Sequence, residues 1–250
     1  MHLHPEIPLH WEKAPVIRQE KGTTLWLVRC KVPTNGGFAA LQKYLPAEDI
    51  ARINRLEQIG DRNASALGIA GLQDWVQRLT GCSPEQYRVL RTVKGKPFLE
   101  GPENLIFPFN WSHSGGYVVW AFIWPACPQQ QVGIDIEIIK PVTEQADIAA
   151  AYFSKREYAF WSTAALRDQA FFQIWTRKEA LLKCAGIGLS EDLPAWETLD
   201  DKLEQPSFPT FNLRTIPFGD DYAVAVAWTG ELHHIRLVDW VHANFTYLSV

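Results

Sequence analysis

The chain has 250 residues, 47% hydrophobic and 21% charged, with a formal net charge of −4 at pH 7. This composition is typical of a globular protein with one large domain or two small ones, and it excludes collagen-like, heptad-repeat and low-complexity architectures. The negative charge gives no general attraction for nucleic acid or anionic membranes, so an anionic ligand would need a local cluster of donors. No stretch reaches the roughly 18 apolar residues of a membrane span. The start of the sequence lacks a secretory pattern, so we expect a cytoplasmic protein.

The cysteines lie far apart, and none belongs to a CxxC pair: Cys30, Cys82, Cys127 and Cys184. Each lies in an apolar or helical context. We therefore expect buried reduced thiols rather than disulfides or a zinc site.

The first half of the chain alternates strand and helix patterns. Strands are expected over 24–31, 87–93, 105–111 and 117–124, with a turn at 35–37. Helices are expected over 47–58 and 64–79, with Gly81 as the terminator of the second.

The second half repeats that order in outline. Its strands are expected over 132–139, 209–215, 222–228 and 233–240, and its helices over 143–152, 154–165 and 168–185. A short echo also links the halves, since GGYVVWA at 115–121 resembles GDDYAVA at 219–225. We predict an α+β fold of two similar α/β lobes, 1–130 and 131–250, related by a pseudo-twofold axis with a ligand cleft between them.

The strand around 132–139 carries two acids among aliphatic residues. Side chains alternate across a strand, so Asp135 and Glu137 share one face while the even-numbered residues from 132 to 138 line the other. A half-buried strand with a wet acidic face would explain this pattern. A divalent cation is the alternative, because like charges at neighbouring positions on one face repel each other unless a positive charge lies between them.

The helix over 168–185 has charged residues inside its apolar arc. Lys178 and Glu179 interrupt a stripe of aromatic and aliphatic side chains, and Lys183 follows one turn after Glu179. An exposed ion pair between Glu179 and Lys183 would contribute only about 0.3–0.5 kcal/mol. A site at the helix surface, with a cation for the glutamate and an anion for the lysines, is the other interpretation.

Two turn-rich segments are candidates for anion binding. The strand at 109–114 runs into Gly115 and Gly116, so backbone amides, two hydroxyls and an imidazole come together in one turn. The segment 94–97 (KGKP) is a second candidate. Either segment is also compatible with an ordinary solvated turn.

Three segments in this order, FNWSHS at 109–114, GIDIE at 133–137 and WTRKEALLKCAG at 175–186, resemble the 4′-phosphopantetheinyl transferases. GKP at 95–97 also matches the family pattern. The similarity is to the long, single-chain, two-lobed type (the surfactin-synthetase-activating class), which serves peptide, polyketide and fatty-acid synthesis. It is recognisable from about residue 87 to residue 190.

The resemblance implies a catalytic role for the acids and lysines of the last two motifs. Asp135, Glu137 and Glu179 would bind one Mg²⁺, which bridges to the pyrophosphate of coenzyme A. Lys183 would neutralise charge on the pyrophosphate, and Lys178 would assist at the phosphates or the pantetheine arm. Glu179 is the family's usual general base, although a metal-ordered water is an alternative.

The resemblance also implies a nucleotide site. Lys96, Ser112 and His113 match positions that hold the 3′-phosphate end of coenzyme A. The family often has an arginine where this chain has Ala64, and Arg62 is a candidate substitute.

The implied reaction transfers the 4′-phosphopantetheine arm of coenzyme A to a serine hydroxyl of an apo carrier-protein domain and releases 3′,5′-ADP. We expect a monomer, because a two-lobed fold forms its site within one chain, and the negative net charge predicts no nucleic-acid or membrane partner. Two other functions remain open at this point. One is a Mg-dependent phosphodiesterase or nucleotide hydrolase using the same acids on water, and the other is a non-catalytic module that binds a carrier protein.

Overall fold

The computed structural model describes residues 11–13, 21–34, 37–92, 96–102, 106–125, 129–188 and 193–240. Most of the expected turn at 35–37, the first half of the KGKP segment (94–95) and Cys127 lie outside these ranges. Within them, no helix combines the length and the apolar character that a membrane crossing requires.

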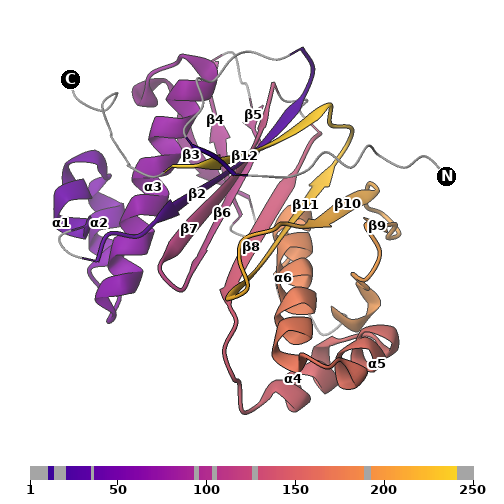
Figure 1. Ribbon diagram of the computed structural model, residues 1–250. Helices are drawn as coiled ribbons and strands as arrows, with labels where there is room; N and C mark the ends of the chain where they lie inside the picture. Colours follow the sequence, from indigo (N-terminus) through magenta and orange to yellow (C-terminus); the bar gives the residue numbers. More distant parts are fainter. Residues whose placement is uncertain are drawn as a thin grey trace.

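The expected elements occur in the expected order (Figure 1), and the structure adds short strands at 12–13, 97–100 and 202–203 and a short helix at 37–41. The strands are β1 Glu12–Lys13, β2 Thr24–Lys31, β3 Arg88–Arg91, β4 Pro97–Glu100, β5 Ile106–Phe107, β6 Phe109–Ser114, β7 Tyr117–Trp124, β8 Val132–Ile138, β9 Lys202–Leu203, β10 Phe211–Thr215, β11 Tyr222–Thr229 and β12 His234–Asp239. The α-helices are α1 Gly37–Leu41, α2 Ala47–Ile53, α3 Ile59–Thr80, α4 Gln145–Tyr152, α5 Lys155–Thr163 and α6 Arg167–Ala185. Short 3₁₀ helices occupy Gln42–Tyr44, Pro84–Gln86 and Leu193–Ala195.

Two local signals fix element ends. Helix α3 stops at Gly81, which adopts the left-handed conformation at φ 75° as the expected terminator. The single strand expected over 105–111 is divided at Pro108, because proline has no amide to donate to a ladder. β5 on one side pairs with β4, and β6 on the other pairs with β7.

The two halves share one topology. In the first, β2 pairs antiparallel with β7, which pairs with β6; in the second, β8 pairs antiparallel with β11, which pairs with β10. Helices lie between the first strand and the closing hairpin in both halves. The echoed segments 115–121 and 219–225 lead into the equivalent strands β7 and β11. This arrangement confirms an α+β fold built from two similar lobes.

The last described strand joins the lobe that comes first in the chain. β12 pairs in parallel with β2, so the larger sheet has the order β1-β12-β2-β7-β6, and the second sheet has the order β8-β11-β10-β9. The expected division of the chain at residues 130 and 131 stays a prediction. The strand pairing adds that residues 234–239 complete the sheet of the first half.

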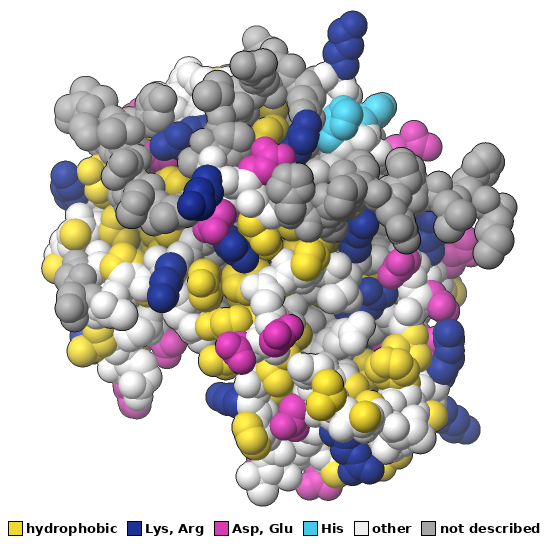
Figure 2. Space-filling model, viewed as in Figure 1, with side chains coloured by type: hydrophobic (Ala, Val, Ile, Leu, Met, Phe, Trp, Pro, Cys, Tyr) yellow, Lys and Arg dark blue, Asp and Glu magenta, His cyan; other side chains and the backbone are white. Residues whose placement is uncertain are grey.

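The two sheets pack face to face between two helical layers (Figure 1). Alternate residues of the strands form the core between the sheets, including Leu25, Leu27, Val119, Ile134, Ile136, Val224 and Val226. The opposite strand faces pack against α3 in the first lobe and against α6 in the second. On the face drawn in Figure 2, acidic and basic side chains are interspersed rather than gathered into one charged area.

Two of the cysteines have the expected burial. Cys30 and Cys184 are buried free thiols, whereas Cys82 is a free thiol only partly buried. Burial raises the pKa of Cys30 to about 12, with a further contribution from Asp239, and burial also raises the pKa of Cys184 to about 12.

Candidate active site

The candidate site lies at the seam where the edge strands of the two sheets, β6 and β8, meet. Strand alternation puts Asn110, Ser112 and Ser114 on the side of β6 that faces β8. Asn110 Oδ1 accepts a hydrogen bond from the Ile134 amide (2.9 Å), and Ser112 Oγ donates to Asp135 Oδ1 (2.8 Å). Side chains thus connect the two edges in place of a backbone ladder.

Asp135 lies at the centre of the seam and is only 4% exposed. Lys183 Nζ lies 2.6 Å from Asp135 Oδ1 and also donates to Ser112 Oγ (3.2 Å) and to the Ile134 carbonyl (3.4 Å). Among the described residues, Asp135 Oδ2 has no hydrogen-bond partner although it is buried. A buried carboxylate oxygen without a donor is costly, so this position suits a cation or a donor from a ligand.

Gly133 sets the separation between β8 and α6. A Cβ atom at this position would lie 2.1 Å from the Ala180 carbonyl oxygen and 2.4 Å from the Cys184 amide nitrogen. Only glycine lets the helix backbone approach the strand this closely. The close approach brings Glu179 and Lys183 of α6 toward the acidic face of β8.

The acids at the seam experience one another's charge. Burial raises the pKa of Glu137, and Asp135 raises it further, while the hydrogen bond from Ser114 and the charge of Lys183 lower it. Burial likewise raises the pKa of Glu179, with Asp135 adding to the rise and Lys183 opposing it. Lys140 also lowers the pKa of Glu137, but Lys183 is the lysine that acts on both glutamates. Three neighbouring carboxylates are the situation that a bound cation relieves.

The residues fit a hard cation. In the described part of the chain, no three His, Cys, Asp or Glu side chains are already arranged around a common metal position. One Asp135 oxygen holds the Lys183 ammonium. The other Asp135 oxygen is open, and carboxylate oxygens are the ligands that Mg²⁺ prefers. The donor chemistry is therefore suitable for Mg²⁺.

His113 and Ser112 adjoin in sequence but leave β6 on opposite faces. The His113 ring stacks on Trp111, with ring centroids 5.8 Å apart, and Gly68 of α3 leaves room for the Trp111 ring. Burial lowers the pKa of His113, and the charge of Asp61 opposes that shift. The expected joint grip of Ser112 and His113 on the nucleotide stays a prediction, and these positions require a ligand that reaches both faces of β6.

Lys96 is engaged by the protein itself. Its ammonium donates to Gln131 Oε1 (3.0 Å), to the Val132 carbonyl (3.3 Å) and to the Cys184 carbonyl (3.0 Å). Burial lowers the pKa of Lys96. Lys96 therefore ties β4 to the start of β8 and to the C-terminal end of α6, where a cation is favoured. The expected contact of Lys96 with the nucleotide phosphate would require exchanging these hydrogen bonds.

Lys178 is held inside the protein, and its expected contact with the phosphates or the pantetheine arm stays a prediction. Its side chain is 1% exposed and pairs with Glu157 of α5 at 2.8 Å. The ammonium also donates to the carbonyls of Leu193 (3.1 Å) and Trp196 (2.8 Å). Successive helix residues diverge by about 100°, so Lys178 points to α5 while its neighbour Glu179 points toward β8.

The candidate substitute for the family arginine is also engaged. Arg62 Nε donates to the Leu56 carbonyl at 2.6 Å, and Ala64 is buried on α3. Arg62 therefore closes the loop between α2 and α3 in this structure.

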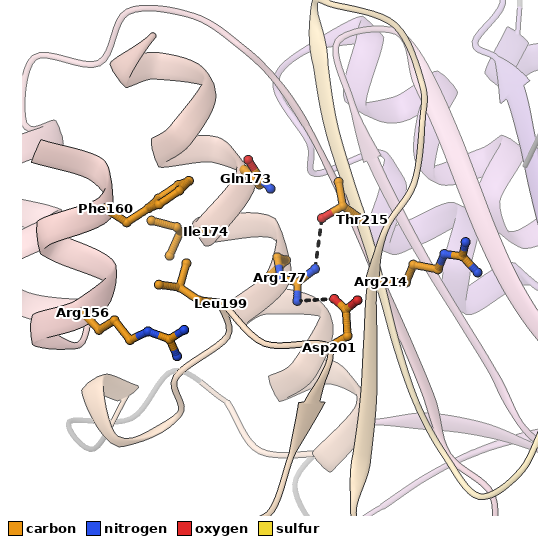
Figure 3. A pocket seen from close by; sticks show the side chains of 9 residues that line it. All are labelled: Arg156, Phe160, Gln173, Ile174, Arg177, Leu199, Asp201, Arg214 and Thr215. Atoms are coloured by element: carbon orange, nitrogen blue, oxygen red, sulfur yellow. Dashed lines mark hydrogen bonds and ion pairs between the residues drawn. The ribbon is translucent and has the colours of Figure 1, made fainter. Parts of the chain in front are cut away.

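A cavity of 520 Å³ lies within the second lobe (Figure 3). Arg177, one of its lining residues, donates to Thr215 Oγ1 (3.1 Å) and Asp201 Oδ1 (3.0 Å). The lining residues are Arg156, Phe160, Gln173, Ile174, Arg177, Leu199, Asp201, Arg214 and Thr215. This cavity is therefore separate from the predicted cleft between the lobes.

Three residues at the seam, Asn110, Ser114 and Gly133, have roles that the sequence did not assign to them individually; the Ser114 hydroxyl was expected only as part of an anion-binding turn. Glu157, away from the seam, was not a candidate either. The alternation of small polar residues in FNWSHS is a signal for the first two. A glycine inside a strand pattern is a signal for the close approach at Gly133. Nothing local marks Glu157 as the partner of Lys178, because the two lie on different helices.

Comparisons with known proteins agree with one another. The model of the 4′-phosphopantetheinyl transferase superfamily matches residues 131–227, and a 4′-phosphopantetheinyl transferase N-terminal model matches residues 31–123. The chain is 28% identical to the 4′-phosphopantetheinyl transferase HetI of Nostoc sp. over 82% of this chain and 87% of that protein. It is 33% identical to the 4′-phosphopantetheinyl transferase psf-1 of Bacillus pumilus (62% and 64%). It is 28% identical to the L-aminoadipate-semialdehyde dehydrogenase-phosphopantetheinyl transferase of Schizosaccharomyces pombe (68% and 67%).

Proposed function

Because the chain belongs to the 4′-phosphopantetheinyl transferase superfamily, we propose that it transfers the 4′-phosphopantetheine arm of coenzyme A to a serine hydroxyl of an apo carrier-protein domain. The serine oxygen attacks the β-phosphorus of coenzyme A, the bond from that phosphorus to the bridging oxygen breaks, and 3′,5′-ADP leaves. The serine proton passes to a base. The carrier gains a phosphodiester-linked arm ending in a thiol.

One observation carries this proposal. At the seam, a buried aspartate holds a lysine with one oxygen and leaves its second oxygen open, and two further carboxylates lie within its electrostatic reach. A site with this charge pattern suits a cation together with a polyanion such as a diphosphate. An ordinary solvated acidic strand would not leave Asp135 only 4% exposed.

The acids Asp135, Glu137 and Glu179 would hold Mg²⁺. When bound, the ion would supply Lewis-acid and electrostatic stabilisation to phosphate oxygens. The positive charge of Lys183 would neutralise part of the negative charge of the diphosphate. It is already within hydrogen-bond reach of the seam through Asp135 and Ser112, so little reorganisation is needed.

Glu179 is the side chain that we propose as acceptor of the serine proton. A carboxylate can accept a proton in its deprotonated form. Glu179 lies on α6 one turn before Lys183. An acceptor next to the phosphate-binding lysine would let proton removal accompany attack on phosphorus. Glu179→Gln keeps the size of the side chain and removes the base.

The decisive experiment mixes the protein with Mg²⁺, coenzyme A and an apo carrier domain and weighs the carrier by mass spectrometry. The expected result is a mass gain equal to one phosphopantetheine group, with release of 3′,5′-ADP. No mass gain across several carrier types would contradict the proposal. The hydrolase alternative lacks support from the comparisons, and it would show coenzyme A consumed without any carrier.

A monomeric cytoplasmic enzyme, with no nucleic-acid or membrane partner, remains our expectation from the sequence. Both lobes and all residues of the seam come from one chain, which supports the monomer. Sedimentation of the purified protein tests it, and a stable dimer would contradict it.

A further inference from the structure

Ser114, the last residue of β6, makes two hydrogen bonds across the seam. Its hydroxyl donates to Glu137 Oε2 (2.9 Å) and accepts from the Ile138 amide (3.1 Å). One hydroxyl thereby holds both the Glu137 carboxylate and the backbone amide of the next residue. Because β8 is an edge strand, its outward amides would otherwise have no sheet partner.

The backbone at Ser114 is constrained by the turn that follows it. Gly115 follows it in the left-handed conformation at φ 56°, and a Cβ atom there would lie 2.7 Å from the Tyr222 ring and 2.8 Å from Ile138 Cβ. The Tyr222 hydroxyl donates to the Gly115 carbonyl. The turn after Ser114 is therefore held against β8 and β11, and this fixes the backbone position from which the Ser114 side chain extends.

The hydrogen bond restricts Glu137 in a specific way. With one oxygen engaged by Ser114, the carboxylate of this half-buried side chain can present its other oxygen, Oε1, to the seam. The hydroxyl is a donor to the carboxylate, so it lowers the pKa of Glu137 against the rise that burial causes. A donor that orients a ligating carboxylate from outside is a common feature of metal sites.

We infer that Ser114 is a positioning residue that orients Glu137 for a divalent cation, and that Asn110 supports the same strand edge through the Ile134 amide. This inference rests on the proposed function, because Glu137 is one of the three acids proposed to hold Mg²⁺. In this role Ser114 acts on the cation through Glu137. Its removal leaves the carboxylate present but unrestrained.

The test compares Ser114→Ala, Ser114→Thr and the matched control Ser162→Ala in the full chain without coenzyme A. Ser162 lies on α5, and its hydroxyl donates to the Ala159 carbonyl within the same helix. Mn²⁺, used as a paramagnetic probe for Mg²⁺, is titrated and followed by electron paramagnetic resonance. The Mg²⁺ dependence of carrier modification is then measured as the Mg²⁺ concentration at half-maximal rate and as kcat.

Loss of an outer partner of a metal ligand typically weakens metal binding by about 10–100-fold. We expect Ser114→Ala to weaken Mn²⁺ binding by at least about 10-fold and to raise the half-maximal Mg²⁺ concentration in parallel. Ser114→Thr keeps the hydroxyl and should stay within about threefold of the unsubstituted protein. Ser162→Ala should leave both quantities unchanged.

An unchanged Mn²⁺ affinity in a folded Ser114→Ala protein would overturn the inference while leaving the proposed function intact. If the unsubstituted protein bound no Mn²⁺, the proposed metal site would fail and the inference with it. If Ser114→Ala did not fold, Ser114→Cys decides, because the thiol is similar in size and a weaker donor. Weakened Mn²⁺ binding in Ser114→Cys but not in Ser114→Thr supports the inference, and equal binding in both overturns it.

Discussion

Replacing Lys178 with methionine should lower the free energy of unfolding by about 3–5 kcal/mol, the usual cost of breaking a buried ion pair. The cost arises mainly at Glu157, the buried partner of Lys178. Glu157 is 0% exposed, and its Oε2 would lose the Lys178 ammonium now 2.8 Å away. The carbonyls of Leu193 and Trp196 would lose a donor as well, so the upper half of that range is expected.

A double substitution tests the cause. Glu157 Oε1 accepts from the amide and the hydroxyl of Thr198, and glutamine can keep those two bonds, although it loses the bond that Oε2 accepts from the Ser154 amide. Lys178→Met combined with Glu157→Gln removes the buried charge and should therefore be more stable than Lys178→Met alone, with a coupling of about 0.5–3 kcal/mol. Lys155→Met, on the exposed side of α5, is the matched control and should change stability by less than about 0.5 kcal/mol.

The assay is urea unfolding followed by circular dichroism, together with the KM for coenzyme A in the folded protein. A buried structural role for Lys178 predicts a large loss of stability with an unchanged KM. A decrease in the free energy of unfolding below about 1 kcal/mol, combined with a strongly raised KM for coenzyme A, would refute the reasoning. That result would indicate that Lys178 contacts the phosphates of coenzyme A.

Three other outcomes follow from the seam and the core. Gly133→Ala should lower the unfolding free energy by about 3 kcal/mol in urea titrations, because the new Cβ meets the Ala180 carbonyl at 2.1 Å; a loss below about 1 kcal/mol would contradict this. Asp135→Asn should reduce carrier modification more than about 100-fold with an unchanged circular dichroism spectrum, and near-normal turnover would count against the site. Cys30 and Cys184 have pKa values raised to about 12 from 9.0, so only the unfolded chain loses these protons as the pH rises above 9.0. Between pH 9.0 and 12, each of the two thiols should therefore lower the free energy of unfolding by about 1.4 kcal/mol per pH unit. Replacing both cysteines with alanine should remove this contribution to the pH dependence.

The sequence by itself determined the elements and the polarity of their faces. The strands over 24–31 and 117–124 have the predicted bounds, and the alternation around 135 correctly separates a core face from an acidic face. These features depend on the two-residue and 3.6-residue repeats of side-chain direction, which any local segment reveals. The ordered motifs also identified the family, because they record residue types that the chemistry needs.

Tertiary structure alone decided which partner each charged or polar group meets. Lys178 and Lys183 are both lysines on α6, yet one is buried against Glu157 and the other reaches Asp135. β12 pairs with β2 about two hundred residues earlier in the chain, and Ser114 meets Glu137 across two sheet edges. Local periodicity fixes the direction of a side chain relative to its own element, but the neighbour in that direction depends on how distant elements pack.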